Sequence, residues 1–415
     1  MTTAAAPKLT FIPDILEEHL EELAFLWGQR TSAIRSPDYT LREIGLLEER
    51  IAAHAQGLLV IGDRLIPFVE EKLGGDDANA VFAAAFALLH LSSDAALQRV
   101  LRAVESAVDA RFDAIRTALC HGPIDRILPN LHAIFASGPA PAAATAAEAL
   151  AFHSALKPPA PRVQEFLTDP DPAVKRSGWR LASYLQLRLD AKTYASGLRD
   201  DDPGVKSAAL TAAAWNGEQA VISLGRQVAT TPAPDHLEAL RLLAILGGPD
   251  DIQRVAMVGM TEAMGPSRFE LVASYGHPAL VDLLLVEMSR AATDPEAAAA
   301  AGSAFERVTG RNVESGTRAT VPPKNGKEPD AFDAEFQDEV VLPDYPTAYH
   351  HWQEAKPQLA HAGRLCRGID VGAGLTAEAF ATLDMQSRWE ICLRGRFQGT
   401  WPGSPIDLER YPLAM

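Results

Sequence analysis

The sequence predicts an all-α protein made of stacked helix pairs, and three observations support this prediction. Apolar residues make up 47% of the 415 positions, and alanine, the best helix former, dominates them. Runs with the period-two alternation of strands are rare, so no stretch predicts a strand. One motif, LTDPDPAVK at 167–175, returns 31 positions later as LRDDDPGVK at 198–206.

The repeated motif places carboxylates and a proline just before a helix. Asp169 and Asp171 in the first copy, and Asp200 and Asp202 in the second, are expected to cap these helices. Their carboxylates can accept hydrogen bonds from free backbone N–H groups, and proline suits the first helical turn. A cation site at Asp200–Asp202 is the weaker alternative. A period near 30 with two helices per unit is typical of an α-solenoid.

Other segments lie on either side of this array. Residues 12–34 and 41–58 have apolar stripes at helical spacing, and Thr40 with Glu43 forms a predicted capping box at the second start. Residues 311–343 are polar and rich in proline and glycine, with acidic residues toward the end, so a flexible or extended linker is expected. The expected parts are an N-terminal helical module (1–75), a solenoid (76–310), the acidic linker (311–343) and a small helical C-terminal module (344–415).

The composition limits the partners and the compartment. A net charge of −16 and a pI near 5.2 argue against nucleic acid or an anionic membrane, and favour a neutral or basic polypeptide. Cys120, Cys366 and Cys392 are too far apart for a disulfide framework or a zinc signature, and reduced thiols are expected. Without a secretory signal or a long apolar run, the sequence predicts a cytoplasmic protein.

No pattern in the sequence predicts a catalytic residue, a metal site or a cofactor. His351 and Glu354 have the spacing of two ligands on one helical face, but two ligands make a weak metal site. The sequence GIDVGAGLT at 368–376 resembles a phosphate loop but lacks its lysine. Cys120 precedes His121, and adjacency alone does not place the imidazole against the thiol. A non-enzymatic protein is therefore expected.

Four residues of the N-terminal helices are candidates for partner contact: Trp27, Arg30, Arg50 and His54. Trp27 lies one turn from Arg30 on the first helix, and Arg50 lies one turn from His54 on the second. Tryptophan and arginine are favoured anchors at interfaces. The alternative, considered stronger, is an internal clamp in which Arg30 or Arg50 pairs with a glutamate across the hairpin while Trp27 packs inside.

A second candidate surface follows the second helix of each repeat, from about residue 205 to 290. Stacked repeats expose a long surface that suits binding to another protein. Trp215 and Tyr275 are the candidate contact residues in this range.

The N-terminal stretch FIPDILEEHLEELAFLWGQRTSAIRSPDYTLREIGLLEERIAAHAQGL resembles the opening of an uncharacterised family of proteobacterial HEAT-repeat proteins. The resemblance extends to AFERVTG at 304–310, LPDYPTAYHHW and GRLCRG. The matching positions are His19, Phe25 to Trp27, Arg30, Pro37 to Tyr39, Glu48 to Arg50, Ala53 to His54 and Gly57 to Leu58. The resemblance implies a HEAT-like solenoid and supplies no catalytic residues.

Members of that family are often encoded beside type VI secretion spike, PAAR-type tip and adaptor genes. The resemblance therefore implies a scaffold or chaperone-like adaptor that binds a secreted effector, tip or spike protein. Three other classes stay open: an immunity protein that masks a basic toxin, a HEAT-type DNA glycosylase, and a HEAT-type lyase that attaches a pigment. The acidic composition argues against the glycosylase, which needs a basic groove.

Overall fold

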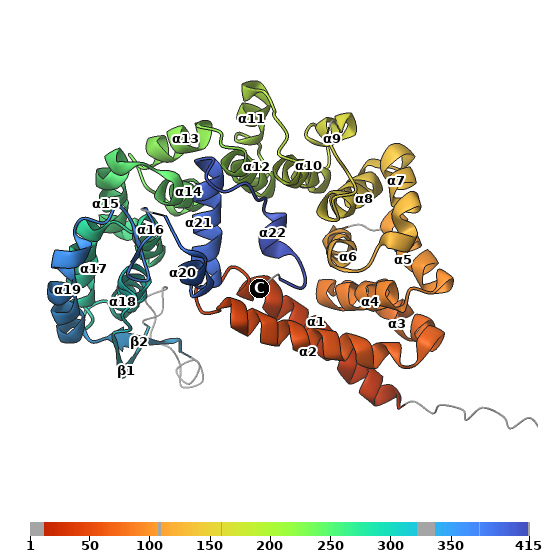
Figure 1. Cartoon of the computed structure of the whole chain (residues 1–415), viewed down its shortest axis with the longest axis horizontal. Coiled ribbons are helices and arrows are strands. Elements are labelled where there is room, and N and C mark those ends of the chain that lie inside the picture. Colours follow the sequence, from red (N-terminus) through yellow and green to blue (C-terminus); the bar gives the residue numbers. More distant parts are fainter. Residues whose placement is uncertain (1–11, 107–108, 159, 322–336, 373, 414–415) are drawn as a thin grey trace, which may run out of the picture. The chain divides into compact units, whose positions relative to one another are not determined.

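The computed structural model describes residues 12–106, 109–158, 160–321, 337–372 and 374–413. The described chain is predominantly helical, which confirms the predicted helical class (Figure 1). It divides into two compact units, each considered by itself. Unit 1 comprises residues 1–216 and 402–415, and unit 2 comprises residues 217–401. The four-part division expected from the sequence stays a prediction.

Unit 1 consists of helices and two short 3₁₀ turns. Its helices are α1 (Pro13–Ala33), α2 (Leu41–Leu59), α3 (Leu65–Leu73), α4 (Ala78–Leu91), α5 (Asp94–Ser106), α6 (Asp109–His121), α7 (Leu128–Ser137), α8 (Ala140–Phe152), α9 (Pro161–Phe166), α10 (Pro172–Tyr184), α11 (Ala191–Gly197), α12 (Pro203–Trp215) and α22 (Ile406–Glu409). The 3₁₀ turns are η1 (Gly62–Arg64) and η2 (Asp125–Ile127).

The helices of unit 1 form two rows. Helices α1, α4, α6, α8, α10 and α12 pack each against the next and make the inner row. Helices α3, α5, α7, α9 and α11 each pack on the inner helix that follows, and α2 packs on α1. Two of the inner helices, α4 and α8, are buried on nearly every side; all residues from Val81 to Leu89 of α4 are buried. Many of them are alanines, which let helices approach closely.

The repeated motif begins two neighbouring inner helices, α10 and α12. Asp171 accepts a hydrogen bond from the N–H of Ala173 at 2.8 Å, and Asp202 accepts one from the N–H of Val205 at 2.8 Å. Asp169 and Asp200 instead accept from the N–H groups of Asp171 and Asp202, and so order the turn before each helix. The capping box of Thr40 and Glu43 is also present at the start of α2.

Unit 2 has the same two-row order in its helical part. Its helices are α13 (Ala220–Val228), α14 (Leu237–Leu246), α15 (Ile252–Met260), α16 (Ser267–Tyr275), α17 (Val281–Met288), α18 (Pro295–Thr309), α19 (Tyr345–Leu359), α20 (Ala377–Ala381) and α21 (Met385–Phe397). Short 3₁₀ turns are η3 (Pro234–His236), η4 (Pro249–Asp251), η5 (Glu262–Met264) and η6 (Pro278–Leu280). Helices α14, α16 and α18 pack in series, covered by α13, α15 and α17 respectively.

Four short strands in unit 2 contradict the expectation that the chain contains none. Strand β1 (Glu314–Thr320) pairs antiparallel with β2 (Glu339–Pro343) and lies against α18. The predicted linker therefore has paired ends, and the part of it at residues 322–336 lies outside the described residues. Strands β3 (Leu365–Cys366) and β4 (Ile369–Asp370) form a second antiparallel pair. Strands β3 and β4 have two residues each, and β1 and β2 do not alternate between buried and exposed residues, so the alternation test does not detect them.

The turn between β3 and β4 closes on the end of α18. Arg367 and Gly368 both have positive φ angles, 51° and 77°, as a two-residue hairpin turn requires. The N–H of Gly368 donates to the carbonyl of Val308 at 2.9 Å. A Cβ at Gly368 would lie 2.6 Å from the carbonyl oxygen of Thr309, so only glycine fits this close approach.

Arginine side chains bind the carbonyl ends of the other inner helices of unit 2. Arg364 donates to the carbonyls of Ala244 at 2.8 Å and Tyr275 at 3.2 Å, near the ends of α14 and α16. Arg394, from α21, donates to the carbonyl of Ile245 at 2.8 Å. The last carbonyls of a helix have no partner within it, and cations are stabilising there. The segment after α19 therefore serves as a set of C-caps.

We predict that replacing Val174 and Val205 together with Asp destabilises unit 1. Both valines are fully buried in the first turns of α10 and α12, so each substitution would bury an unpaired carboxylate. We expect thermal unfolding of unit 1 to begin at a clearly lower temperature, measured by circular dichroism. Ser207→Asp, at an exposed position of α12, is the control and should leave the melting temperature nearly unchanged. Equal melting of the double variant and wild type would contradict the buried role of the two valines.

Candidate functional site

The most elaborate set of side-chain contacts in unit 1 surrounds the C-terminal segment of the chain. We call residues 404–413 the tail; it contains α22 and lies on the inner side of the curved inner row of unit 1 (Figure 1). Ile406 and Leu408 are each 6% exposed. Ile406 packs in a cluster with Cys120, Phe152 and Tyr184, which come from α6, α8 and α10. These apolar contacts bury one side of the tail.

Arg30 joins the two N-terminal helices to the tail. Its Nε donates to Oε1 of Glu48 at 2.7 Å, and both side chains are almost fully buried. Its Nη2 donates to the backbone carbonyls of Glu409 at 3.1 Å and Arg410 at 2.8 Å. Burial lowers the pKa of Arg30, and Glu48 opposes this effect. Removing either partner of such a buried pair leaves an uncompensated charge, at a typical cost of about 3–5 kcal/mol.

Tyr411 inserts its ring among aromatic side chains of α1 and α4. The ring centroid lies 5.7 Å from that of Trp27 and 5.7 Å from that of Phe86, both in edge-to-face geometry. The guanidinium of Arg30 lies 5.1 Å from the Trp27 centroid and 5.4 Å from the Tyr411 centroid, which favours cation–π attraction to both. The hydroxyl donates to the carbonyl of Glu48 at 3.4 Å. Burial raises the pKa of Tyr411 to about 12.

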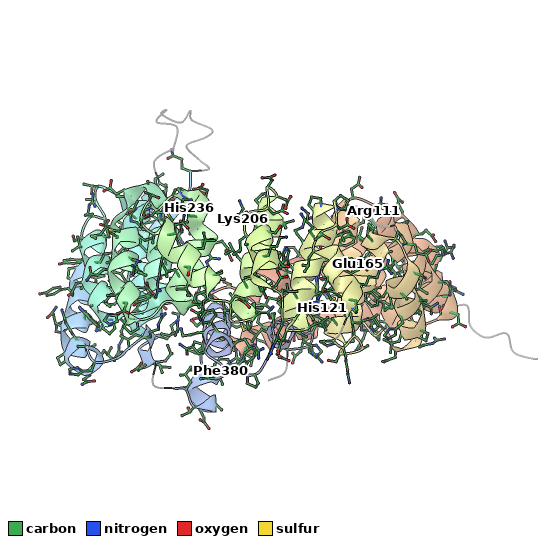
Figure 2. All side chains as sticks on the ribbon, turned by 90° about the horizontal axis from the view of Figure 1, so that it is seen from above. Arg111, His121, Glu165, Lys206, His236 and Phe380 are labelled. Atoms are coloured by element: carbon green, nitrogen blue, oxygen red, sulfur yellow. The ribbon has the colours of Figure 1, made fainter. Side chains whose placement is uncertain are left out.

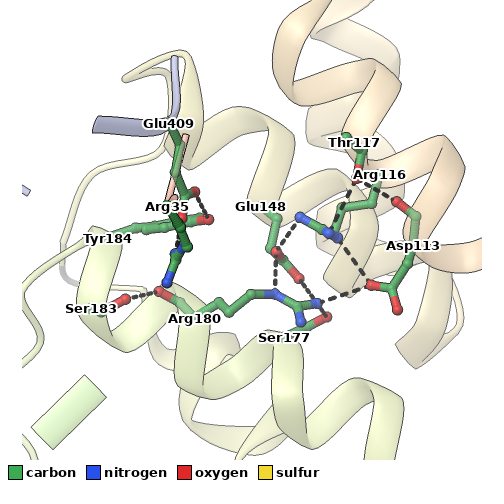
Figure 3. Close-up of polar contacts among 10 residues, drawn as sticks. All are labelled: Arg35, Asp113, Arg116, Thr117, Glu148, Ser177, Arg180, Ser183, Tyr184 and Glu409. Carbon is green, nitrogen blue, oxygen red and sulfur yellow. Dashed lines mark hydrogen bonds and ion pairs between the residues drawn. The ribbon is translucent and has the colours of Figure 1, made fainter. Parts of the chain in front are cut away.

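The side chains of Glu409 and Arg410 hold the tail through polar bonds to unit 1. The Glu409 carboxylate accepts from Nη2 of Arg35 at 2.9 Å and from the hydroxyl of Tyr184 at 2.9 Å (Figure 3). Arg410 donates to the carbonyl of Phe152, the last residue of α8, at 3.3 Å. Residues that contact the tail through these bonds and rings form what we call the tail groove: Trp27, Arg30, Arg35, Glu48, Phe152 and Tyr184.

A buried ion network lies beside the tail groove on α6, α8 and α10. Glu148 is fully buried, and its carboxylate accepts two bonds from Arg180 at 2.8 and 2.9 Å and one from Arg116 at 3.3 Å (Figure 3). Oδ1 of Asp113 also accepts a hydrogen bond from Arg116 at 3.2 Å and one from Arg180 at 3.5 Å. Burial acts to lower the pKa of Arg180, but the charge and hydrogen bonds of Glu148, together with the charge of Asp113, raise it overall. The network is balanced in charge and holds three successive inner helices together.

The network was missed in the sequence, although a signal for it was present. Arg116, Glu148 and Arg180 are spaced by 32 and 32 positions, close to the repeat length, and so occupy equivalent places on successive inner helices. Alternating charges at one repeat position can pair across neighbouring repeats. A search for charge at the repeat spacing would have found these residues.

The four N-terminal candidate residues lie in two different environments in the structure. Trp27 and Arg30 are buried at 3% and 1% exposure and both contact the tail. The pairing of Arg30 with Glu48 has the geometry of the internal clamp. Arg50 lies 3.8 Å from Glu22 with both side chains exposed. Nδ1 of His54 lies 3.1 Å from Nδ1 of His19, and burial lowers the pKa of His54.

The other candidates are mostly internal. Trp215 and Tyr275 are each 2% exposed, and the Tyr275 hydroxyl donates to the carbonyl of Gly248 at 2.8 Å. Glu354 lies 3.2 Å from Nε2 of His350, rather than beside His351 as the spacing suggested. Across the described ranges, no three His, Cys, Asp or Glu side chains gather as a metal would require. None of the described helices combines the length and hydropathy needed to span a membrane.

Cys120 and His121 lie next to the tail groove, in environments that favour their neutral forms. Burial raises the pKa of the Cys120 thiol to about 12, so it stays protonated at neutral pH. His121 (labelled in Figure 2) has its ring 5.0 Å from Trp27 and 4.8 Å from Phe152, and its buried Nδ1 has no hydrogen-bond partner. Burial, followed by repulsion from Arg30, holds the pKa of His121 well below its ordinary value.

Comparison of the chain with protein-family models, curated proteins and solved structures found no match.

We predict that Glu148→Gln strongly destabilises unit 1. The substitution keeps the shape but leaves the charges of Arg116 and Arg180 without their shared buried partner. We expect the free energy of unfolding to fall by about 3 kcal/mol, measured by urea denaturation. Glu70→Gln, which breaks an exposed pair with Arg99, is the matched control and should cost less than about 1 kcal/mol. Equal effects of the two substitutions would mean that the network contributes little.

His121 gives a prediction about pH. Below its ordinary pKa of 6.5, His121 binds a proton in the unfolded chain but not in the folded one, so folding stability falls as the pH falls. Between pH 6.5 and 5, we expect the folding stability of His121→Leu to decline less steeply than that of the wild type, by up to about 1.4 kcal/mol per pH unit. Urea denaturation at several pH values measures this slope. An unchanged slope would show that His121 does not resist protonation.

Proposed function

We propose that this protein is a non-enzymatic scaffold that binds another protein through a HEAT-like α-solenoid. The observation that carries the proposal is the two-row order of helices in each unit. Each inner helix packs on the next inner helix, and the outer helices pack against the inner ones. In solenoids, such stacking creates long surfaces that suit protein binding. The repeated, aspartate-capped starts of α10 and α12 support the same architecture.

We place the main partner surface on the outer helices of unit 2, within the range from 205 to 290. Met257 and Met260 of α15 and Val286 of α17 are exposed by 46%, 62% and 60%. Helices α15 and α17 are neighbours, so these side chains belong to one side of the unit. Methionine adapts well to the surface of a partner, and exposed apolar groups are candidates for burial on binding.

The N-terminal pair is the second part of the proposed surface. Arg50 and His54 remain accessible on α2, whereas Trp27 and Arg30 are occupied by internal contacts. The net charge of −16 suits a neutral or basic polypeptide. The resemblance of the N-terminal motif suggests the partner's class: a secreted effector, a PAAR-type tip or a spike protein of type VI secretion. The proposed role is that of an adaptor in the cytoplasm.

Affinity capture from the native host followed by mass spectrometry tests this function. We predict that the wild-type protein recovers a spike, tip or effector protein, and that Met260→Glu with Val286→Glu greatly reduces this recovery, because charge replaces apolar contact. Ala133→Glu, at an exposed position of α7 in unit 1, is the control and should leave recovery unchanged.

Two results would contradict the proposal. Capture without any spike, tip or effector protein would remove the secretion role, and equal recovery by the double variant would exclude the outer surface of unit 2. Recovery of a basic toxin whose activity the protein abolishes would instead favour the immunity class.

A further inference from the structure

The contacts of the tail are those of a bound peptide rather than those of a packed helix. In the tail groove, Arg35 and Tyr184 bind the carboxylate of Glu409, and Arg30 donates to two backbone carbonyls of the tail. It also holds an aromatic ring, that of Tyr411, against Trp27. These contacts combine backbone recognition with side-chain selection, as peptide-binding surfaces do.

The backbone N–H of Leu413, near the end of the tail, is also bound by a side chain of the groove. Oε2 of Glu48 accepts a bond from the N–H of Leu413 at 3.0 Å, while its Oε1 binds Arg30. One buried carboxylate thus holds both the groove's own arginine and the peptide's backbone. The recognised sequence is Glu409-Arg410-Tyr411-Pro412-Leu413, with Ile406 as an additional apolar anchor.

We propose that the tail groove is a peptide-binding site that accepts the tail of a second copy of this chain in place of its own. None of the inner helices of unit 1 belongs to the tail, so its departure need not break any of them. The residues before it include Gly399 with φ of 75°, Pro402 and Gly403, a composition typical of connecting segments. Exchange of an identical element between copies is a low-cost route to association.

The tail competes with any incoming peptide. A tethered segment acts at an effective concentration of the order of 1 mM when the connection is short and flexible. A free tail peptide therefore binds the wild-type chain weakly, although the groove itself is selective. Weakening the contacts of the chain's own tail removes this competition and exposes the groove. This inference goes beyond the proposed scaffold function and depends on unit 1 alone.

The test uses a fluorescently labelled peptide with the sequence of residues 402–415 and the full-length protein. Glu409→Ala with Tyr411→Ala in the protein weakens its own tail but leaves the groove intact. Fluorescence anisotropy should show that this variant binds the peptide at least about tenfold more tightly than the wild-type protein does. Adding Arg35→Ala to the variant should reverse most of the gain, and a peptide of scrambled sequence should not bind.

The absence of saturable binding to the folded tail variant at peptide concentrations up to about 1 mM would overturn the proposal. Binding that Arg35→Ala leaves unchanged would overturn it as well, because the peptide would then be bound elsewhere.

A second measurement applies if the tail variant does not fold. A protease site inserted between Gly403 and Ser404 of the otherwise unchanged protein allows the tail to be cut and retained without a covalent link. Size-exclusion chromatography should then show the labelled peptide replacing the native fragment during incubation. Failure of the folded, cleaved protein to take up the peptide would contradict the exchange.

Discussion

The inner helices of this protein end in carbonyl groups that lack hydrogen-bond donors within the helix. Side chains from other parts of the chain supply donors for several of these carbonyls. In unit 1, Arg410 donates to the carbonyl at the end of α8, and Nε2 of His153 donates to the carbonyl of Leu119 near the end of α6. In unit 2, Arg364 and Arg394 bind the ends of α14 and α16. Buried carbonyls without donors are costly, so helices stacked this closely require these caps.

This constraint explains why the C-terminal part of the chain is so rich in buried arginine. A guanidinium offers several N–H donors in one plane and keeps its charge when buried, so one side chain can serve two helices at once. Arg364 does this for α14 and α16, and Arg30 does the same for two carbonyls of the tail. The tail is held by such polar bonds together with the buried side chains of Ile406 and Leu408. Such a segment can dissociate and rebind more readily than an inner helix can.

Local signals in the sequence predicted the elements that they control. The helices near residues 12–34 and 41–58, the capping box of Thr40 and the aspartates before α10 and α12 depend on neighbouring residues. Within the apolar stripe predicted for residues 12–34, Ile15 is 46% exposed, because the choice of buried face depends on which helices pack against it.

Contacts between distant parts of the chain could not be predicted in this way. Nothing in the sequence of the tail indicates that Glu409 meets Arg35. The pairing of Glu48 with Arg30 was one of several possible pairs across the hairpin. The strands were missed because β3 and β4 have only two residues each, and because β1 and β2 lack the alternation of buried and exposed residues that marks a half-buried strand.

Hydrogen–deuterium exchange of the full-length protein tests most directly whether the tail occupies its groove. The account predicts that the amides of residues 406–413 are protected. Peptides covering Arg30 and Glu48 should lose protection when Glu409→Ala and Tyr411→Ala weaken the tail. Exchange of residues 406–413 at the rate of an unstructured chain would contradict the account.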